Sequence, residues 1–63
     1  MQVDNQGTVF IFVPEGDYEY EWLTVNLDTQ PYQWFGTSLT VDYRFADDII
    51  DAINYAGFVI DWI

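Results

Sequence analysis

The chain has 63 residues, the size of one domain (residues 1–63) whose core stabilises the fold by no more than a few kcal/mol. It has eleven acidic residues and one basic residue, Arg44, so the net charge is −10 at pH 7. A hydrophobic content of 51% and an aromatic content of 21% exclude a disordered acidic tail, which has few aromatic residues.

Residue types that the chain lacks exclude several kinds of site. Without cysteine there are no disulfides and no thiolate metal sites. Without histidine there are no imidazole zinc sites and no Ser–His or Cys–His nucleophiles. No segment approaches the roughly 18 apolar residues of a membrane span, and the first residues, MQVDNQGTVF, lack the features of a signal peptide. We therefore expect a protein that does not enter a membrane, and the cysteine count leaves the redox compartment open.

Residues 8–13 (TVFIFV) predict the first strand, because a continuous run of β-branched and aromatic residues is typical of a strand buried on both faces. Pro14 and Gly16 predict a turn, since proline presets the first central position of a turn and glycine accepts positive φ. The aromatic and β-branched residues that follow predict a hairpin partner strand over residues 18–25.

A helix over residues 17–27 is the alternative for the same segment. Tyr18, Trp22 and Val25 fall at i, i+4 and i+7, which is the spacing of one helix face. With a helix here, the order of elements becomes βαββαβ, which resembles the ferredoxin-like arrangement.

A second hairpin is predicted in the segment YQWFGTSLTVDYRF, after a loop that ends at Pro31. Gly36 and Thr37 suit a two-residue type II′ turn, whose first central position requires positive φ. Pairing of Phe35 with Ser38 then assigns alternate residues to the two faces of the hairpin. The residues expected in the core are Tyr32, Trp34, Leu39, Val41 and Tyr43, and those expected in solvent are Gln33, Ser38, Thr40, Asp42 and Arg44.

Residues 46–56 predict the clearest helix, which Gly57 is placed to end, and residues 58–63 predict a last strand. The apolar face of this helix is expected to consist of Ala46, Ile49, Ile50, Ile53 and Ala56. We therefore expect an α+β fold, with a small antiparallel sheet of four or five strands and one helix packed on one face.

Catalysis and metal binding are the first two explanations of the acidic residues. General acid–base catalysis needs a carboxyl group whose pKa is shifted by burial in a cleft, whereas almost every acidic residue falls at a position predicted to be exposed. The segment from Asp4 to Gly7 has some character of a calcium loop but lacks the later acidic ligands of an EF-hand. We therefore expect no enzyme, no metal site and no cofactor.

Ordinary structural roles are the third explanation. Asp47 and Asp48 suit the first turn of a helix, where the helix dipole favours anions. Asp28 is typical of a turn, and Asp61 suits an outward position on the last strand. Each acidic residue would then do no more than solvate the surface.

Imitation of a nucleic-acid backbone is the fourth explanation. On a strand, Glu19 and Glu21 project from one face about 6.6 Å apart, comparable to the separation of successive phosphates. On the predicted helix, Asp47 and Asp51 lie one turn apart, with neighbouring side chains about 6 Å from each other. An exposed Phe35 adds a hydrophobic anchor for a partner. The expected partner-binding residues are Glu15, Asp17, Glu19, Glu21, Asp47, Asp48, Asp51 and Phe35.

The acidic stretch EGDYEYE (residues 15–21) and the DD-x-x-D pattern (residues 47–51) resemble, in so small and base-poor a chain, the phage-encoded DNA-mimic inhibitors and among them the anti-CRISPR proteins. The resemblance implies a stoichiometric inhibitor that blocks the DNA-binding surface of a CRISPR effector in the bacterial cytoplasm. It also implies a basic partner protein, no direct contact with nucleic acid or membrane, and a monomer or weak homodimer.

A restriction enzyme, a DNA glycosylase or a polymerase is an alternative target of the same mimicry. The rival from a different class is a small structural or assembly protein that forms a homo-oligomer. Mimicry predicts acidic residues that cluster on one face, whereas the rival predicts dispersed acidic residues and a contiguous apolar interface.

Overall fold

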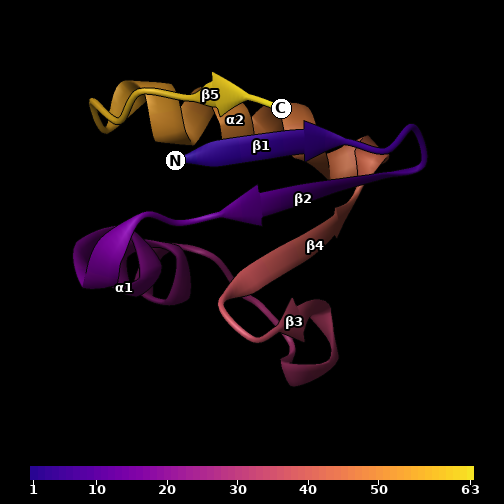
Figure 1. The fold of residues 1–63 in the computed structure, drawn as a ribbon, viewed down its shortest axis with the longest axis horizontal. Helices are drawn as coiled ribbons and strands as arrows, with labels where there is room; N and C mark the ends of the chain where they lie inside the picture. The colour runs from indigo at the N-terminus through magenta and orange to yellow at the C-terminus, as the bar shows by residue number, and fades with distance from the viewer.

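The computed structural model describes residues 1–63 and contains a five-stranded sheet and two α-helices (Figure 1). The elements are β1 (Gln2–Asn5), β2 (Val9–Val13), α1 (Gly16–Asn26), the 3₁₀-helix η1 (Pro31–Gln33), β3 (Trp34–Phe35), β4 (Ser38–Asp42), α2 (Tyr43–Tyr55) and β5 (Asp61–Trp62). The expected α+β class with five strands is therefore confirmed, but a second helix is present.

The strands lie in the order β3-β4-β2-β1-β5. All neighbouring pairs are antiparallel except β1 and β5, which run parallel, so the sheet is mixed and not wholly antiparallel. From β2 to β5 the order of elements is βαββαβ, the order of the ferredoxin-like alternative. Strand β1 is an addition that lies between β2 and β5.

The expected strand over residues 18–25 is wrong, since this segment belongs to helix α1. One edge of β2 pairs with β1 and the other with β4, so neither edge is free for a hairpin partner after residue 16. The helix also places Leu23 in the core with no exposed surface. The alternative helix is therefore the right assignment, and the tyrosines and tryptophan that favour a strand do not decide it.

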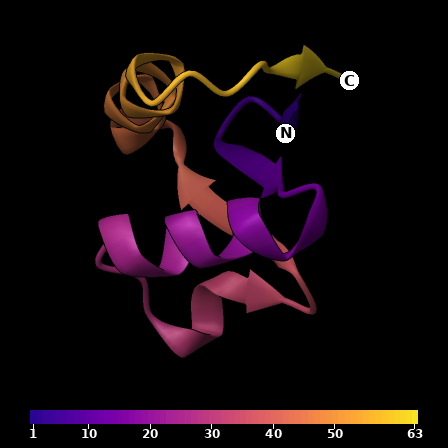
Figure 2. The same cartoon turned by 90° about the vertical axis from the view of Figure 1, so that its left-hand side faces the viewer.

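Both helices contribute to one core on one face of the sheet. The buried strand residues Val3, Phe12 and Leu39 lie opposite one another across β1, β2 and β4, and therefore on the same face. Leu23 from α1 and Ala46 and Ile53 from α2 complete this cluster, together with Met1 and Val41. Figure 2 shows α2 nearly end-on and α1 from the side, so the two helix axes are strongly inclined to each other.

The second hairpin confirms the expected register, with Phe35 paired to Ser38 and Trp34 to Leu39. Gly36 has a φ of 63°, whereas Thr37, like every residue other than glycine in this chain, has no positive φ. Positive φ at only the first of the two central residues fits a type II′ turn. Leu39 and Val41 are buried as expected.

The pairing ends earlier than expected because η1 precedes β3. Tyr32 is therefore wrongly assigned to the core: it lies in η1 and is 79% exposed. Tyr43 is also exposed, as the first residue of α2. Gln33, expected in solvent, is half-buried, since its side chain accepts a hydrogen bond from the Gln30 backbone and donates one to the Thr40 carbonyl oxygen.

Helix α2 begins three residues earlier than expected. Asp42 is its N-cap and accepts a hydrogen bond from the Arg44 backbone N–H (2.9 Å). At the other end, Gly57 has a φ of 92°. The Gly57 and Phe58 N–H groups donate to the Asn54 and Ile53 carbonyls, which is a Schellman motif. Ala56, expected on the inner face, is exposed at this end.

Candidate functional site

Most carboxylates have no cationic partner. Asp42 pairs with Arg44 at 3.0 Å, and Glu19 pairs with the N-terminal ammonium of Met1 at 3.2 Å. These are the two ion pairs of the chain, so nine of its eleven acidic residues are in no ion pair. No three carboxylates converge as metal ligands would.

The Asp42–Arg44 pair is a local helix-capping unit. The hydrogen bond from the Arg44 side chain, with a second from its backbone N–H, lowers the pKa of the Asp42 carboxyl group. The same side-chain contact raises the pKa of Arg44, whose guanidinium also lies over the Phe45 ring, 5.8 Å from its centroid. The single basic side chain is therefore engaged within the protein.

Helix α1 separates the acidic residues expected to form one line. At about 100° per residue, Glu19 and Glu21 lie on nearly opposite sides of the helix. Glu19 is only 17% exposed and accepts a hydrogen bond from the Glu15 backbone N–H besides its ion pair. Asp17 and Glu21 are exposed and lie one turn apart on a shared face. The prediction that Glu19 and Glu21 share one face at phosphate-like spacing is therefore wrong. The two acidic residues that α1 exposes on one face are Asp17 and Glu21.

Helix α2 keeps three acidic residues together. Asp47, Asp48 and Asp51 are exposed and fall at i, i+1 and i+4, on the side opposite the buried Ala46 and Ile53. Because α2 begins at Tyr43, its first turn holds no acidic residue, and Asp47 and Asp48 lie in the second. The dipole falls off within one turn, so the expected first-turn role is wrong.

A groove runs between the outer faces of the two helices. One hollow of about 650 Å³ is lined by Trp22, Asn26 and Leu27 from α1 with its following residue and by Asp51, Ala52, Tyr55 and Ala56 from α2. An adjoining hollow of about 220 Å³ is lined by Tyr18, Glu21, Trp22, Val25 and Asn26. The two share Trp22 and Asn26, so they form one continuous surface, which we call the helix groove. Glu21 of α1 lines one of its two hollows, and Asp51 of α2 lines the other.

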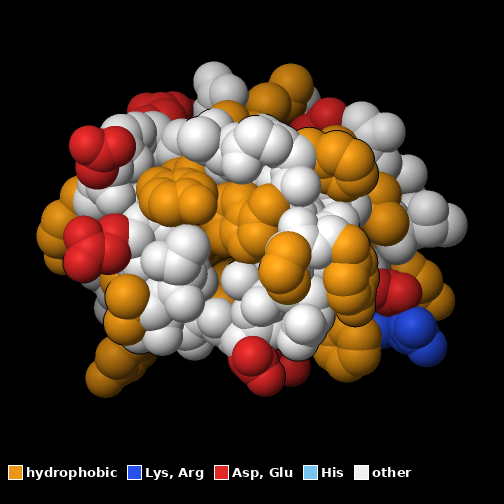
Figure 3. Space-filling model, turned by 90° about the horizontal axis from the view of Figure 1, so that it is seen from below, with side chains coloured by type: hydrophobic (Ala, Val, Ile, Leu, Met, Phe, Trp, Pro, Cys, Tyr) orange, Lys and Arg blue, Asp and Glu red, His pale blue; other side chains and the backbone are white.

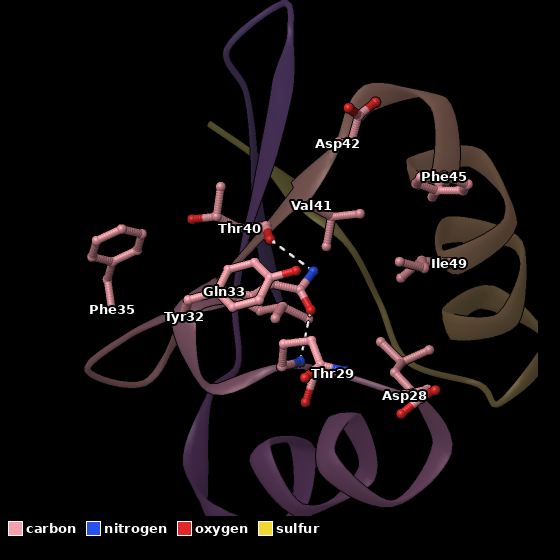
Figure 4. A pocket seen from close by; sticks show the side chains of 13 residues that line it. Asp28, Thr29, Tyr32, Gln33, Phe35, Thr40, Val41, Asp42, Phe45 and Ile49 are labelled. Atoms are coloured by element: carbon pink, nitrogen blue, oxygen red, sulfur yellow. Dashed lines mark hydrogen bonds between the residues drawn. The ribbon is translucent and has the colours of Figure 1, made fainter.

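A second cavity, of about 600 Å³, lies between the loop at residues 27–33, the second hairpin and α2. Phe45 and Ile49 line its α2 side, and Phe35 lies on the far side from them (Figure 4). Phe35 is exposed on the edge strand β3, as expected. It does not line the helix groove.

The surface mixes apolar and acidic side chains. Hydrophobic side chains occupy much of the middle of the face seen from below, and acidic side chains lie toward its margins (Figure 3). Glu15 lies at the N-cap of α1, Asp28 in the loop after α1, Asp4 on β1 and Asp61 on β5. The acidic residues are thus spread over the molecule, and only α2 gathers three on one face.

Sequence reasoning missed the exposed apolar residues of α1. Tyr18 and Val25 are among the most exposed large hydrophobic side chains, and Trp22 lies between them. Their i, i+4, i+7 spacing marks a second apolar face on a helix whose inward face is already supplied by Leu23 and Leu27. This second apolar face is the sequence signal of the exposed surface, in which Trp22 is half-buried against the core and Tyr18 and Val25 remain in solvent.

Comparison with known proteins adds no relative: no family model, curated protein or solved structure matches the chain. Neither helix has the length and apolar character to cross a membrane.

Proposed function

We propose that the protein is a non-catalytic inhibitor that binds a basic nucleic-acid-binding protein of a bacterial host and occupies its DNA-binding surface. A CRISPR effector is the favoured target, and a restriction enzyme, DNA glycosylase or polymerase is the alternative. The observation that carries the proposal is the acidic face of α2, where Asp47, Asp48 and Asp51 have neither an ion-pair partner nor a helix-capping role.

Electrostatics supports this reading. Neighbouring carboxylates one helical turn apart lie about 6 Å from each other, which is comparable to phosphate spacing along a nucleic-acid strand. A groove of Lys and Arg side chains that binds DNA phosphates also attracts such carboxylates by charge. With a net charge of −10 and its one base paired, the protein attracts cationic surfaces and repels nucleic acid.

The arrangement of carboxylates also favours a binding function over catalysis. Acid–base catalysis needs carboxyl groups brought together in a cleft, where burial and mutual repulsion separate their pKa values. Here the acidic residues are spread over both helices, three strands and the segments on either side of α1, without convergence on one point.

A homo-oligomer is the second candidate, and two observations favour it: most acidic residues are dispersed over the molecule, which mimicry does not predict, and one face of the sheet is uncovered. Val9, Ile11 and Val13 alternate with the core residues of β2 and are only half-buried. The net charge of −10 on each copy opposes such pairing at low ionic strength. Sedimentation equilibrium at low and high salt separates the candidates, because an assembly protein associates more strongly when salt screens its charge.

The proposal is tested by competition for DNA binding. Purified representatives of the four target classes are mixed with labelled DNA and increasing amounts of the protein, and bound DNA is measured by mobility shift. We expect displacement of DNA from one class at near-stoichiometric amounts at low salt, weakening as salt rises. The protein is not an acidic mimic if all four classes retain their DNA at low salt.

A further inference from the structure

We infer that the helix groove is the docking site for a basic amphipathic segment of the partner, with apolar side chains seated in the groove and Lys or Arg side chains at Glu21 and Asp51. The inference rests on the proposed function in that the partner is basic. It adds that apolar contacts in the groove contribute to binding, together with charged contacts at Glu21 and Asp51.

Helix α1 is apolar on two sides, and packing within the chain covers only part of the second side: Trp22 is half-buried against the core, whereas Tyr18 and Val25 are mostly exposed. Leu23 and Leu27 face the core. Tyr18, Trp22 and Val25 form a second stripe along the groove, and Tyr18 and Val25 keep most of their surface in solvent. An exposed apolar stripe bordered by charge is typical of an interaction surface.

The aromatic residues of this stripe are held in place. The Trp22 ring lies edge-on to Phe58 at 5.4 Å between centroids, and the Tyr18 ring lies 5.7 Å from the same phenylalanine. Phe58 follows α2, so it ties this side of α1 to the second helix. Aromatic anchors fixed before binding lose little side-chain entropy when a partner docks.

The α2 side of the groove contains two small residues. Ala52 and Ala56 lie one turn apart on α2 and line the hollow, with Tyr55 beside them. Small residues let another chain approach the helix closely, so the groove accepts a helical or extended segment across Trp22 and Leu27.

Charge selects the occupant. Glu21 lines one part of the groove and Asp51 the other, and neither is in an ion pair. A second copy of this chain brings a further net charge of −10 and has no free base to place there. A segment with apolar residues and several Lys or Arg residues satisfies both features of the surface.

The probe for the test is a synthetic Leu–Lys peptide patterned as an amphipathic helix, with a Ser–Lys peptide of equal charge as its counterpart. Binding is measured by fluorescence anisotropy and mapped by amide chemical shifts. We expect the Leu–Lys peptide to bind more tightly and to shift amides around Trp22, Val25 and Ala52. Equal affinity for the two peptides, or shifts centred on the sheet, overturns the inference.

Matched variants locate the site. Val25→Asn changes the groove, and Val59→Asn changes a valine of nearly equal exposure (74% and 73%) that does not line it. Asp51→Asn and Asp61→Asn remove the same charge within and outside the groove. We expect about a tenfold loss of peptide affinity for Val25→Asn, as for one good apolar contact, and up to about a fivefold loss for Asp51→Asn, as for one exposed ion pair. Each control is expected to lose less than its groove partner. Equal losses within each pair overturn the inference.

Failure of the groove and failure of the proposed function give different results. If Val25→Asn loses peptide binding and no nucleic-acid enzyme is inhibited by the parent, the groove stands and the inhibitor function falls. If the parent and Val25→Asn inhibit DNA binding equally well, the function stands and the groove is not its docking site.

Discussion

The Glu19 carboxylate lies 3.2 Å from the ammonium nitrogen of Met1 and is mostly shielded from solvent. It also accepts a hydrogen bond of 2.8 Å from the Glu15 backbone N–H at the start of α1. Glu19 therefore joins the beginning of the chain to the first helix and is not free to contact a partner, although the pattern EGDYEYE treats it like its neighbour Glu21.

Glu19→Gln is expected to destabilise the fold and Glu21→Gln to leave it unchanged. Glutamine can still accept the Glu15 N–H but lacks the charge that pairs with Met1, and a hydrogen bond to a charged group is worth about 1 kcal/mol more than a neutral one. Each kcal/mol lowers the melting temperature of a small domain by about 4–8 °C. Glu21 is exposed and in no ion pair, so its loss is expected to stay within about 0.5 kcal/mol. Thermal melts of both variants check this, and equal melting temperatures contradict the assigned role of Glu19.

Ile53 is fully buried in the core between α2 and the sheet. Ile53→Ala is expected to cost about 2–5 kcal/mol, because it removes apolar contacts and leaves a cavity. A domain of this size has only a few kcal/mol of stability, so the variant is expected to be largely unfolded at room temperature. Urea titration followed by circular dichroism measures the loss. Ile63→Ala, at an exposed isoleucine, is the control, and a similar loss there would place the core elsewhere.

The pH dependence of stability follows from Asp42. Its pKa lies below the ordinary value of 3.8 because the Arg44 side chain donates to it, so the charged form stabilises the fold. This stabilisation is complete at pH values above the pKa that Asp42 has in the unfolded chain. It is lost as the pH falls through the lower pKa that Asp42 has in the folded protein. Asn also caps helices well, so Asp42→Asn removes mainly the charge. We expect the variant to melt below the parent near neutral pH, and the difference to shrink as the pH falls below about 4. A constant difference across this range excludes the assignment.

Gly36 tests the hairpin turn. A Cβ atom at this position would have no heavy atom within 4 Å, so the cost of a substitution comes from its φ of 63°. Gly36→Val is expected to lose roughly 1–3 kcal/mol, since a β-branched residue is strained there. Gly36→Asn is expected to lose less, because asparagine tolerates positive φ. Melting temperatures that rank valine above asparagine would reject the type II′ turn.

Local chemistry predicted the second hairpin and most of α2. The Gly36-Thr37 turn sets the register of Trp34 and Leu39, and Gly57 with the spacing of Ala46 and Ile53 determines the helix face. These features depend on neighbours in the sequence, so pattern reasoning finds them.

Segment 16–26 was decided by contacts far along the chain. Residues 2–5 occupy the β2 edge that a hairpin partner needs, and no pattern around Tyr18 reports this. The wrong strand assignment also gave a wrong candidate site. Glu19 and Glu21 share a face on a strand but lie on nearly opposite sides of a helix. The α2 residues Asp47 and Asp51 kept their expected relation, since their segment was a helix in both cases.

The last prediction concerns the acidic face of α2. Asp47→Lys with Asp51→Lys changes the net charge from −10 to −6 and places two cations on the face proposed to meet a Lys/Arg groove. Like-charge contacts at an interface cost several kcal/mol. Inhibition of DNA binding is therefore expected to fall by at least about a hundredfold. Both positions are exposed on α2, and lower self-repulsion offsets part of any cost to the helix, so the fold is expected to persist.

A control variant of equal net charge is needed, because any basic substitution weakens long-range attraction to a cationic partner. Asp28→Lys with Asp61→Lys gives the same net charge but changes the loop after α1 and strand β5. Mimicry by α2 predicts a much larger loss for the helix variant than for this control at the same ionic strength, with the difference persisting when salt screens the long-range term. Equal losses in the two variants would mean that the partner responds only to overall charge, and the face formed by Asp47, Asp48 and Asp51 would then have no specific role.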